Sequence, residues 1–232
     1  MLSGVVIEGD KMSELLVAFD LDGTLIDSVP ALAHASDQVM IEMGRPTNGL
    51  NNVRHWIGNG ADMLMARSLS VDIVPDPELD PELLKHARSR FDYFYAQTDH
   101  SLSKLYPNVA ETLQHLAEQD ITMALITNKP EQFVPGILEH HQLERFFSDI
   151  IGGDTLPERK PSPLALNTLM EKFQLNADSI WMVGDSQNDI ESAKAAGCRS
   201  IGLTYGYNYG IPIADSSPNH VVDDIADILR HL

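Results

Sequence analysis

One short stretch decides the fold of this chain: Leu15-Leu16-Val17-Ala18-Phe19-Asp20-Leu21-Asp22-Gly23-Thr24. The apolar run that begins at Leu15 predicts a buried strand, and the strand ends in two carboxylates. Side chains alternate along an extended segment, so Asp20 and Asp22 share one face while Leu21 packs on the other. Because two neighbouring carboxylates repel each other, the pattern predicts a bound cation at the end of this strand.

The two residues after the carboxylates are suited to binding an anion next to that cation. Gly23 allows a turn in which a larger side chain would clash, and Thr24 offers a hydroxyl and a backbone N–H. Mg²⁺ and a phosphate fit this arrangement. An EF-hand calcium loop is excluded, because it needs acidic residues where the chain has Ala18 and Val29. A plain turn between a strand and a helix is the remaining alternative.

Composition excludes several other classes of protein. The chain of 232 residues is 43% hydrophobic, which is enough for a sizeable core. A formal charge of -18, from 16 basic and 34 acidic residues, disfavours nucleic acid as a partner. The sequence has no apolar run long enough to cross a membrane, so we expect no membrane partner.

The single cysteine and the first residues indicate the cellular compartment to expect. Cys198 excludes an intrachain disulfide and is expected to be a small core residue at the start of a strand, as suits a reducing compartment. Residues 1–11 lack a basic segment followed by an apolar one, so they are predicted to be an N-terminal extension, with Met12 as an alternative start. We therefore expect a cytoplasmic protein.

Residues 28–105 show helical periodicity and no strand pattern. Two helices are predicted at residues 61–69 and 83–94. A third is predicted after Ser28, its expected cap, because apolar residues recur at spacings of three and four: Leu32, Ala35, Val39 and Met43. The segment is therefore expected to be an all-helical insertion.

From residue 106 the pattern changes to alternating strands and helices. Strands are predicted at residues 121–126, 149–151, 180–183 and 200–203, with helices between them and a last short strand and helix at the end. Strands separated by helices imply a parallel sheet with helices on both faces. We therefore predict a Rossmann-like, doubly wound α/β core formed by residues 12–27 and 106–232, with residues 28–105 as a helical cap domain.

Polar residues follow each of the first four predicted strands, where parallel α/β sheets bind their ligands. After the carboxylates of the first strand, the later strands add Thr127 and Asn128, then Lys160, then Asp185, Ser186 and Asp189. Each has an ordinary alternative: Thr127 can cap a helix, Lys160 can be a solvated loop residue, and Ser186 with Asp189 has capping-box spacing. Their shared placement predicts one pocket built from four loops.

Together these segments resemble the four motifs of the haloacid dehalogenase superfamily. The motifs are Asp20-Leu21-Asp22-Gly23-Thr24, Thr127, Lys160 before Pro161, and Gly184-Asp185 followed by Asp189. The resemblance covers the whole chain and implies an α/β core with an inserted cap. Dehalogenases of the superfamily attack carbon and need no metal, so the second aspartate, Asp22, favours phosphoryl transfer.

The resemblance also implies roles for the two leading carboxylates and a cofactor. Asp20 is expected to attack phosphorus and form an aspartyl-phosphate. Asp22 is expected to act first as an acid and then as a base, so it starts the reaction protonated, held so by burial and the nearby carboxylates. Mg²⁺ is the expected metal because the ligands are hard oxygens: Asp20, the backbone carbonyl of Asp22, and Asp185.

The same resemblance implies a set of supporting residues. Lys160, with the metal, is expected to keep Asp20 ionised, and Asp189 beside Ser186 is expected to hold either Lys160 or a water ligand of the metal. Lys160 and Thr127 complete the catalytic set. The transferring phosphate is expected to contact residues from three loops: Gly23, Thr24, Thr127, Asn128 and Lys160.

Further segments resemble enzymes of the superfamily that act on small phosphorylated acids: residues 56–60, 106–109, 127–131, 152–154, 160–163 and 202–210. The first candidate substrate is 2-phosphoglycolate, hydrolysed to glycolate and phosphate. Its far end is a carboxylate, which Arg54 or the N–H groups of residues 58–60 are expected to receive. The tyrosines of the last segment have no function that follows from their spacing.

Three alternatives share much of this pattern. A phosphomutase resembling β-phosphoglucomutase uses the same aspartyl-phosphate but returns the group to a sugar. A broad-specificity sugar phosphatase uses the same chemistry on larger substrates. A non-enzymatic protein that binds an anion and regulates a partner is the third, and the intact Asp20 and Asp22 argue against it.

Overall fold

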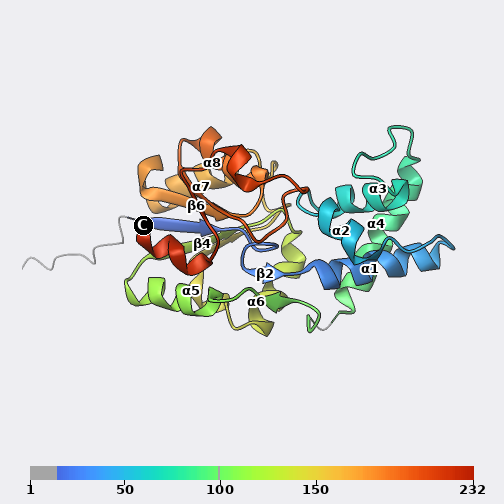
Figure 1. Ribbon diagram of the computed structural model, residues 1–232, viewed down its shortest axis with the longest axis horizontal. Helices are drawn as coiled ribbons and strands as arrows, with labels where there is room; N and C mark the ends of the chain where they lie inside the picture. The colour runs from blue at the N-terminus through green and yellow to red at the C-terminus, as the bar shows by residue number, and fades with distance from the viewer. Residues whose placement is uncertain (1–14, 99) are drawn as a thin grey trace, which may run out of the picture.

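The computed structural model describes residues 15–98 and 100–232. It has two parts, a sheet flanked by helices and a group of four helices beyond one end of the strands (Figure 1). The predicted N-terminal extension and Met12 lie outside the described residues. Within the described part of the chain, no helix is long and apolar enough to span a membrane.

The sheet has six parallel strands in the order β5-β4-β1-β6-β7-β8. The apolar run after Leu15 forms β1, which lies at the centre between β4 and β6 and is buried along its whole length. A strand buried on both faces is apolar throughout, as this one is. The strands are β1 (Leu16–Phe19), β4 (Thr122–Ile126), β5 (Asp149–Ile151), β6 (Ile180–Gly184), β7 (Arg199–Leu203) and β8 (His220–Val222).

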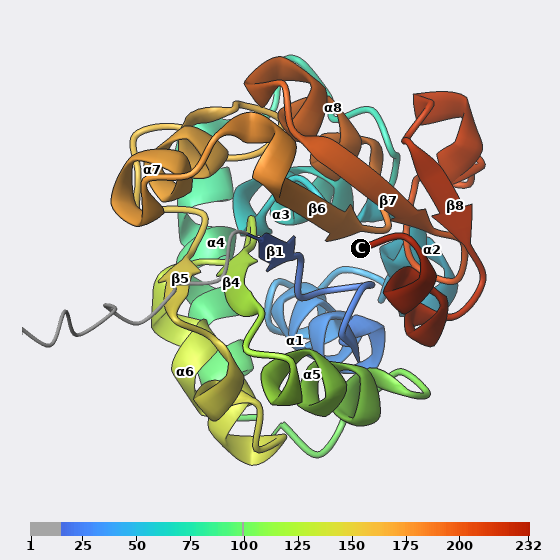
Figure 2. The same ribbon diagram turned by 90° about the vertical axis from the view of Figure 1, so that its left-hand side faces the viewer.

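Alternate residues of β1 belong to separate cores on the two faces of the sheet. Val17 and Phe19 pack in a cluster with α5 (Val109–Glu118), α6 (Val134–His140) and the 3₁₀ helix η5 (Ile225–Arg230). Leu16 and Ala18 pack in another with α7 (Leu164–Phe173) and α8 (Gln187–Ala196). Figure 2 shows these helices on opposite sides of the strands. The predicted doubly wound α/β fold is confirmed.

Four helices make up the second part and share a core of their own. They are α1 (Val29–Glu42), α2 (Gly49–Trp56), α3 (Ala61–Ser70) and α4 (Pro81–Ala96). The two chain segments that connect this group to the sheet pair as a short antiparallel ribbon, β2 (Ile26–Asp27) with β3 (Lys104–Leu105). Phe133, from the 3₁₀ helix η1 (Glu131–Phe133), and Tyr207 also pack into the helical core, so the two parts touch.

Two local expectations were wrong, and one helix was not predicted. The hydroxyl of Ser28 does not cap α1; instead Asp27 Oδ1 accepts a hydrogen bond of 3.2 Å from Val29 N. The last helix is the 3₁₀ helix η5. Helix α2 was not predicted, because its eight residues bury only Val53 and Trp56 and so carry little periodic signal.

Three further 3₁₀ turns are η2 (Glu144–Phe146), η3 (Ala177–Ser179) and η4 (Ile213–Ser216). Cys198 is buried directly before β7, as expected.

The core between the sheet and α5 provides a test of the packing. Leu113 of α5 is fully buried, whereas its neighbour Gln114 is exposed. We expect Leu113→Ala to lower the free energy of unfolding by about 2–5 kcal/mol, since it leaves a cavity in a packed core. Urea denaturation measures this. The matched control Gln114→Ala changes the same quantity by less than about 0.5 kcal/mol, and equal effects of the two changes would contradict the described packing.

Candidate active site

The first carboxylates lie at the end of β1, at the centre of the sheet edge. Asp20 continues the strand, because its N–H donates a hydrogen bond of 3.0 Å to Val183 O of β6, and its side chain is buried. The chain then turns sharply at Gly23, which has a φ of 95° and donates a hydrogen bond of 2.8 Å to Ile26 O. A Cβ at Gly23 would overlap with the carboxylate of Asp185. Glycine here therefore serves both the turn and the close approach of two loops.

Asp185 follows β6 and is held by two donors from other loops. Thr24 Oγ1 donates a hydrogen bond of 2.8 Å to Asp185 Oδ1, and Tyr207 N donates to Oδ2. The backbone of Gly206 approaches so closely that a Cβ there would overlap with Asp185. The Thr24 hydroxyl was expected to face the phosphate; in the structure it is directed at Asp185.

Lys160 is buried between two carboxylates and uses all three of its N–H groups. Its Nζ lies 2.8 Å from Asp20 Oδ1 and 2.7 Å from Asp189 Oδ1, and it donates a hydrogen bond of 2.7 Å to Ile126 O. The other oxygen of Asp189 accepts hydrogen bonds of 3.0 Å from Ser186 N and 2.8 Å from Ser186 Oγ. The capping contact between Ser186 and Asp189 and the salt bridge to Lys160 therefore exist together.

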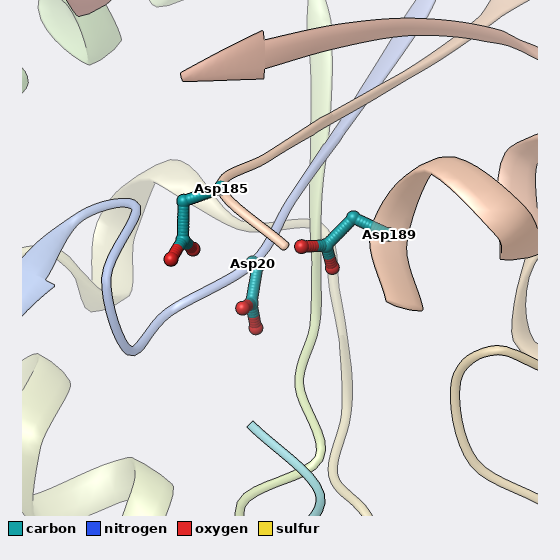
Figure 3. A group of neighbouring side chains, drawn as sticks. All are labelled: Asp20, Asp185 and Asp189. Atoms are coloured by element: carbon teal, nitrogen blue, oxygen red, sulfur yellow. The ribbon is translucent and has the colours of Figure 1, made fainter. Parts of the chain in front are cut away.

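Asp20, Asp185 and Asp189 bring carboxylate oxygens within 4.8 Å of one another (Figure 3). Burial raises the pKa of Asp20 to about 7, although Lys160 acts in the opposite direction. Burial, with the charges of Asp20 and Asp189, also raises the pKa of Asp185. Lys160 alone therefore does not fully offset the burial of Asp20, and the site fits a further cation. One oxygen of Asp189 is paired with Lys160 and the other accepts two hydrogen bonds from Ser186. Asp185 is held only by neutral donors, and Asp20 pairs with Lys160 through one oxygen, so Asp20 and Asp185 are the carboxylates best placed to hold the cation.

The loop after β4 lies beside these groups. Thr127 is buried, and its hydroxyl oxygen accepts a hydrogen bond of 3.2 Å from Lys129 N, which leaves the hydroxyl hydrogen for another acceptor. Asn128 Nδ2 donates to Lys160 O at 2.9 Å and to Gly58 O at 3.0 Å. Asn128, expected to bind phosphate, thus joins the loops around the site and connects them to the helical part.

Lys129 is a site residue that the sequence reasoning did not select. Its Nζ lies 3.1 Å from both carboxylate oxygens of Asp22, and it is 4.7 Å from the ring centroid of Tyr95 in α4. The sequence did not predict this salt bridge between Lys129 and Asp22. The only signal in the sequence was the position of Lys129, two residues after Thr127 in a loop that follows a strand.

A small cavity lies between the carboxylates and the helices. Its volume is about 50 Å³, which is little compared with the ~300–1,000 Å³ of pockets for drug-sized ligands. Asp20 and Asp22 line one side together with Thr127, Asn128 and Lys129. The other side is mainly apolar and consists of Leu32, Ile57, Ala61, Leu64, Phe91, Tyr95, Pro130 and Phe133, with Gly58 and Gly60 at the edge.

Arg54 lies elsewhere. Its Nη2 is 3.6 Å from Asp27 Oδ2, its guanidinium is 5.4 Å from the ring centroid of Tyr207, and it lines a separate cavity with His55. Of the two groups expected to receive the far end of the substrate, the structure brings Gly58 and Gly60 to the cavity of Asp20 but not Arg54.

The tyrosine-rich segment supports the loops of the site. Tyr205 donates a hydrogen bond of 2.8 Å to Thr24 O, Tyr207 donates through its hydroxyl to Asp27, and Tyr209 accepts one of 3.1 Å from Asn188. With the N–H of Tyr207 on Asp185, the segment contacts both the turn after β1 and the segment that leads into the helices. These contacts are long-range, which explains why spacing did not indicate them.

This fold and the buried group of carboxylates around one lysine are those of a hydrolase family. The sequence model described as "Haloacid dehalogenase-like hydrolase" matches residues 17–203, and the chain belongs to that family.

Within the family, the similar proteins carry one recurring name. A protein of Vibrio cholerae serotype O1 named "Phosphoglycolate phosphatase" is 57% identical over 93% of this chain and 95% of its own length. A protein of the same name from Pseudomonas putida is 49% identical over 92% of this chain and 78% of its own length. The crystal structure of a predicted phosphoglycolate phosphatase from Haemophilus somnus has a TM-score of 0.87 and 42% identity, covering 95% of this chain and 99% of its own.

The close approach of Gly206 to Asp185 provides a test of the cation site. We expect Gly206→Ala to displace the Asp185 carboxylate and weaken divalent-cation binding about 10- to 100-fold, as is usual when the support of a metal ligand is lost. Calorimetric titration with Mg²⁺ measures the dissociation constant. In the control Gly136→Ala, the added methyl meets only the far end of His100, and affinity should stay as in the unaltered protein. Unchanged affinity in Gly206→Ala would contradict a role for Asp185 in holding the cation.

Proposed function

We propose that the protein is a Mg²⁺-dependent phosphatase that hydrolyses 2-phosphoglycolate to glycolate and phosphate. The observation that carries this proposal is the buried Asp20 carboxylate, which lines a small cavity and lies beside Lys160 and Asp185. The name shared by relatives up to 57% identical supports the choice of substrate.

The donor set supports Mg²⁺ as the cation. Asp20, Asp185 and the backbone carbonyl of Asp22 offer only hard oxygen atoms, which suit this ion. When bound, Mg²⁺ supplies positive charge next to the transferring phosphoryl group. The raised pKa values of Asp20 and Asp185 indicate that these carboxylates gain most from such a charge.

In the first half of the reaction, an oxygen of Asp20 attacks phosphorus and the bond from phosphorus to the ester oxygen breaks. Asp22 gives its proton to the departing alkoxide of glycolate. Negative charge on the phosphoryl oxygens is offset by Lys160 and by the free hydrogen of the Thr127 hydroxyl. In the second half, Asp22 takes a proton from water, and the resulting hydroxide oxygen attacks the aspartyl-phosphate to release phosphate and restore Asp20.

The helical part acts as a cap in this proposal. We assign residues 28–105 to the cap domain, residues 12–27 and 106–232 to the core, and the ribbon of β2 and β3 to the hinge region. Asn128 and Asn188 both donate hydrogen bonds of 3.0 Å to Gly58 O, which holds the cap against the core. A cap held in this way excludes bulk water from a reaction intermediate that water would hydrolyse prematurely.

The size of the cavity favours a small ester over the alternatives. A volume of about 50 Å³ with an apolar wall leaves little space or hydrogen-bonding capacity for a sugar, which disfavours a phosphomutase or a sugar phosphatase. We place the reaction in the cytoplasm, as the use of a single buried cysteine suggests.

The covalent step is tested by replacing the nucleophile. We expect Asp20→Asn to lower kcat at least ~10³-fold, since the amide cannot displace the ester oxygen. Acid quenching of the unaltered protein during turnover of ³²P-labelled phosphoglycolate should leave the label on residue 20, as peptide mapping measures. Asp20→Asn should carry no label, and a label on any other residue would contradict the assignment.

The cofactor and the substrate are tested in one assay of phosphate release. Phosphoglycolate should be turned over with Mg²⁺, and chelation by EDTA should remove at least ~90% of the rate, because the carboxylates then repel the phosphate. Excess Mg²⁺ should restore it. Glucose 6-phosphate, a mononucleotide and pyrophosphate should each react at least ~10-fold more slowly, measured as kcat/KM. Similar values for all four would reduce the proposal to a general phosphatase.

A further inference from the structure

Lys129 is a buried, charged residue of the small cavity, and it has no role in the reaction proposed above. It is 6% exposed and points into the small cavity, where its Nζ contacts both oxygens of Asp22 at 3.1 Å. Beyond Asp22, it faces the ring of Tyr95 and the apolar wall formed by the helices. Its contacts with Asp22 use two of its three N–H groups, which leaves one donor in an apolar environment that favours a further anionic partner.

Lys160 and Arg54, the two basic residues that the sequence suggested for the substrate, are occupied elsewhere. Lys160 has its three donors on Asp20, Asp189 and the carbonyl of Ile126. Arg54 lines a different cavity and lies beside Asp27. Among the described residues that line the cavity of Asp20, Lys129 is the one basic side chain.

The distances between Asp22 and Lys129 suit a ligand whose carboxylate is separated from the ester oxygen of its phosphate by one methylene group. In 2-phosphoglycolate, roughly 3–3.5 Å separates the ester oxygen from a carboxylate oxygen, given ordinary bond lengths. Asp22, as the acid for the ester oxygen, must lie within a hydrogen bond of it, and Lys129 Nζ is 3.1 Å from Asp22. A substrate placed for attack by Asp20 therefore brings its carboxylate within reach of Lys129.

We propose that Lys129 is a specificity-determining residue that binds the carboxylate of the substrate, with the hydroxyl of Tyr95 as a second donor. This inference rests on the proposed phosphatase function and adds to it the group that selects a phosphorylated acid over a neutral ester. Arg54, which the sequence suggested for this task, has no part in it.

The hydroxyl of Tyr95 is an independent observation in favour of this site. Tyr95 is 1% exposed, and among the described residues its hydroxyl hydrogen finds no acceptor within hydrogen-bond distance, which is unusual for a buried polar group. Tyr95 lines the same cavity as Lys129. A carboxylate bound by Lys129 at this position would give that hydroxyl an acceptor.

A substrate carboxylate at this position would compete with Asp22 for the N–H groups of Lys129. A substrate without a carboxylate would leave the salt bridge between Lys129 and Asp22 in place.

The test compares two esters of similar size, phosphoglycolate and 2-hydroxyethyl phosphate, which lacks the carboxylate. In Lys129→Met, the ratio of kcat/KM for phosphoglycolate to that for 2-hydroxyethyl phosphate should fall at least ~10-fold, as expected when a hydrogen bond to a charged group is lost. Lys129→Arg should retain part of the ratio, and Tyr95→Phe should lower it ~3-fold or more. The control Lys172→Met removes a half-exposed lysine paired with Asp149 and should leave both values unchanged.

A binding measurement separates this inference from the proposed function. In the inactive Asp20→Asn background, Lys129→Met should weaken the binding of phosphoglycolate at least ~10-fold by calorimetry and leave that of 2-hydroxyethyl phosphate within ~2-fold. An equal loss for both esters, in rate and in binding, would show that Lys129 only positions Asp22 and would overturn the inference. If the unaltered protein does not prefer phosphoglycolate at all, it is the proposed function that fails.

Discussion

One buried ammonium group, that of Lys160, makes this site possible. Three carboxylates, those of Asp20, Asp185 and Asp189, lie almost without solvent at the end of two adjacent strands. Burying several like charges together is very costly unless a cation and hydrogen bonds compensate. Lys160 contacts two of the three carboxylates and fills its last donor position with a backbone carbonyl. The remaining imbalance of charge is what suits the site to a further cation.

The other supports of the site come from close approach of the backbone. Glycines at positions 23 and 206 allow two loops to reach Asp185, where any side chain would overlap with it. The donors that hold Asp185 belong to Thr24 and Tyr207, which lie far from it in the chain. The parallel strand order β4-β1-β6-β7 brings these segments to one edge. A rigid support of this kind positions a carboxylate for chemistry without reorganisation during the reaction.

Two residues, Lys129 and Tyr207, connect the site to the helices. Lys129 joins Asp22 of the sheet part to the ring of Tyr95 in α4. Tyr207, whose N–H donates to Asp185, packs into the core of the helical part. Gly58 O accepts hydrogen bonds from both Asn128 and Asn188. Opening the helices would break these contacts together, so ligand binding and cap position are linked in the proposed reaction.

The sequence by itself determined the order of elements and the leading residues of the site. The strands of the sheet were predicted to within one residue where they could be assigned, because continuous apolar runs such as Leu16–Phe19 mark buried parallel strands. Asp20, Asp185, Asp189 and Lys160 were found because they follow those strands, and the structure brings them together. Local pattern failed for α2, which buries few residues, and for the cap of α1.

Only the tertiary structure decided which partner each polar group has. The hydroxyl of Thr24 donates to Asp185, Arg54 lies beside Asp27, and Lys129 contacts Asp22 and the ring of Tyr95. None of these contacts produces a periodic pattern in the sequence. A hydrogen bond or salt bridge depends on distances in space between residues that can be more than a hundred positions apart. Periodicity reports only which face of an element is buried.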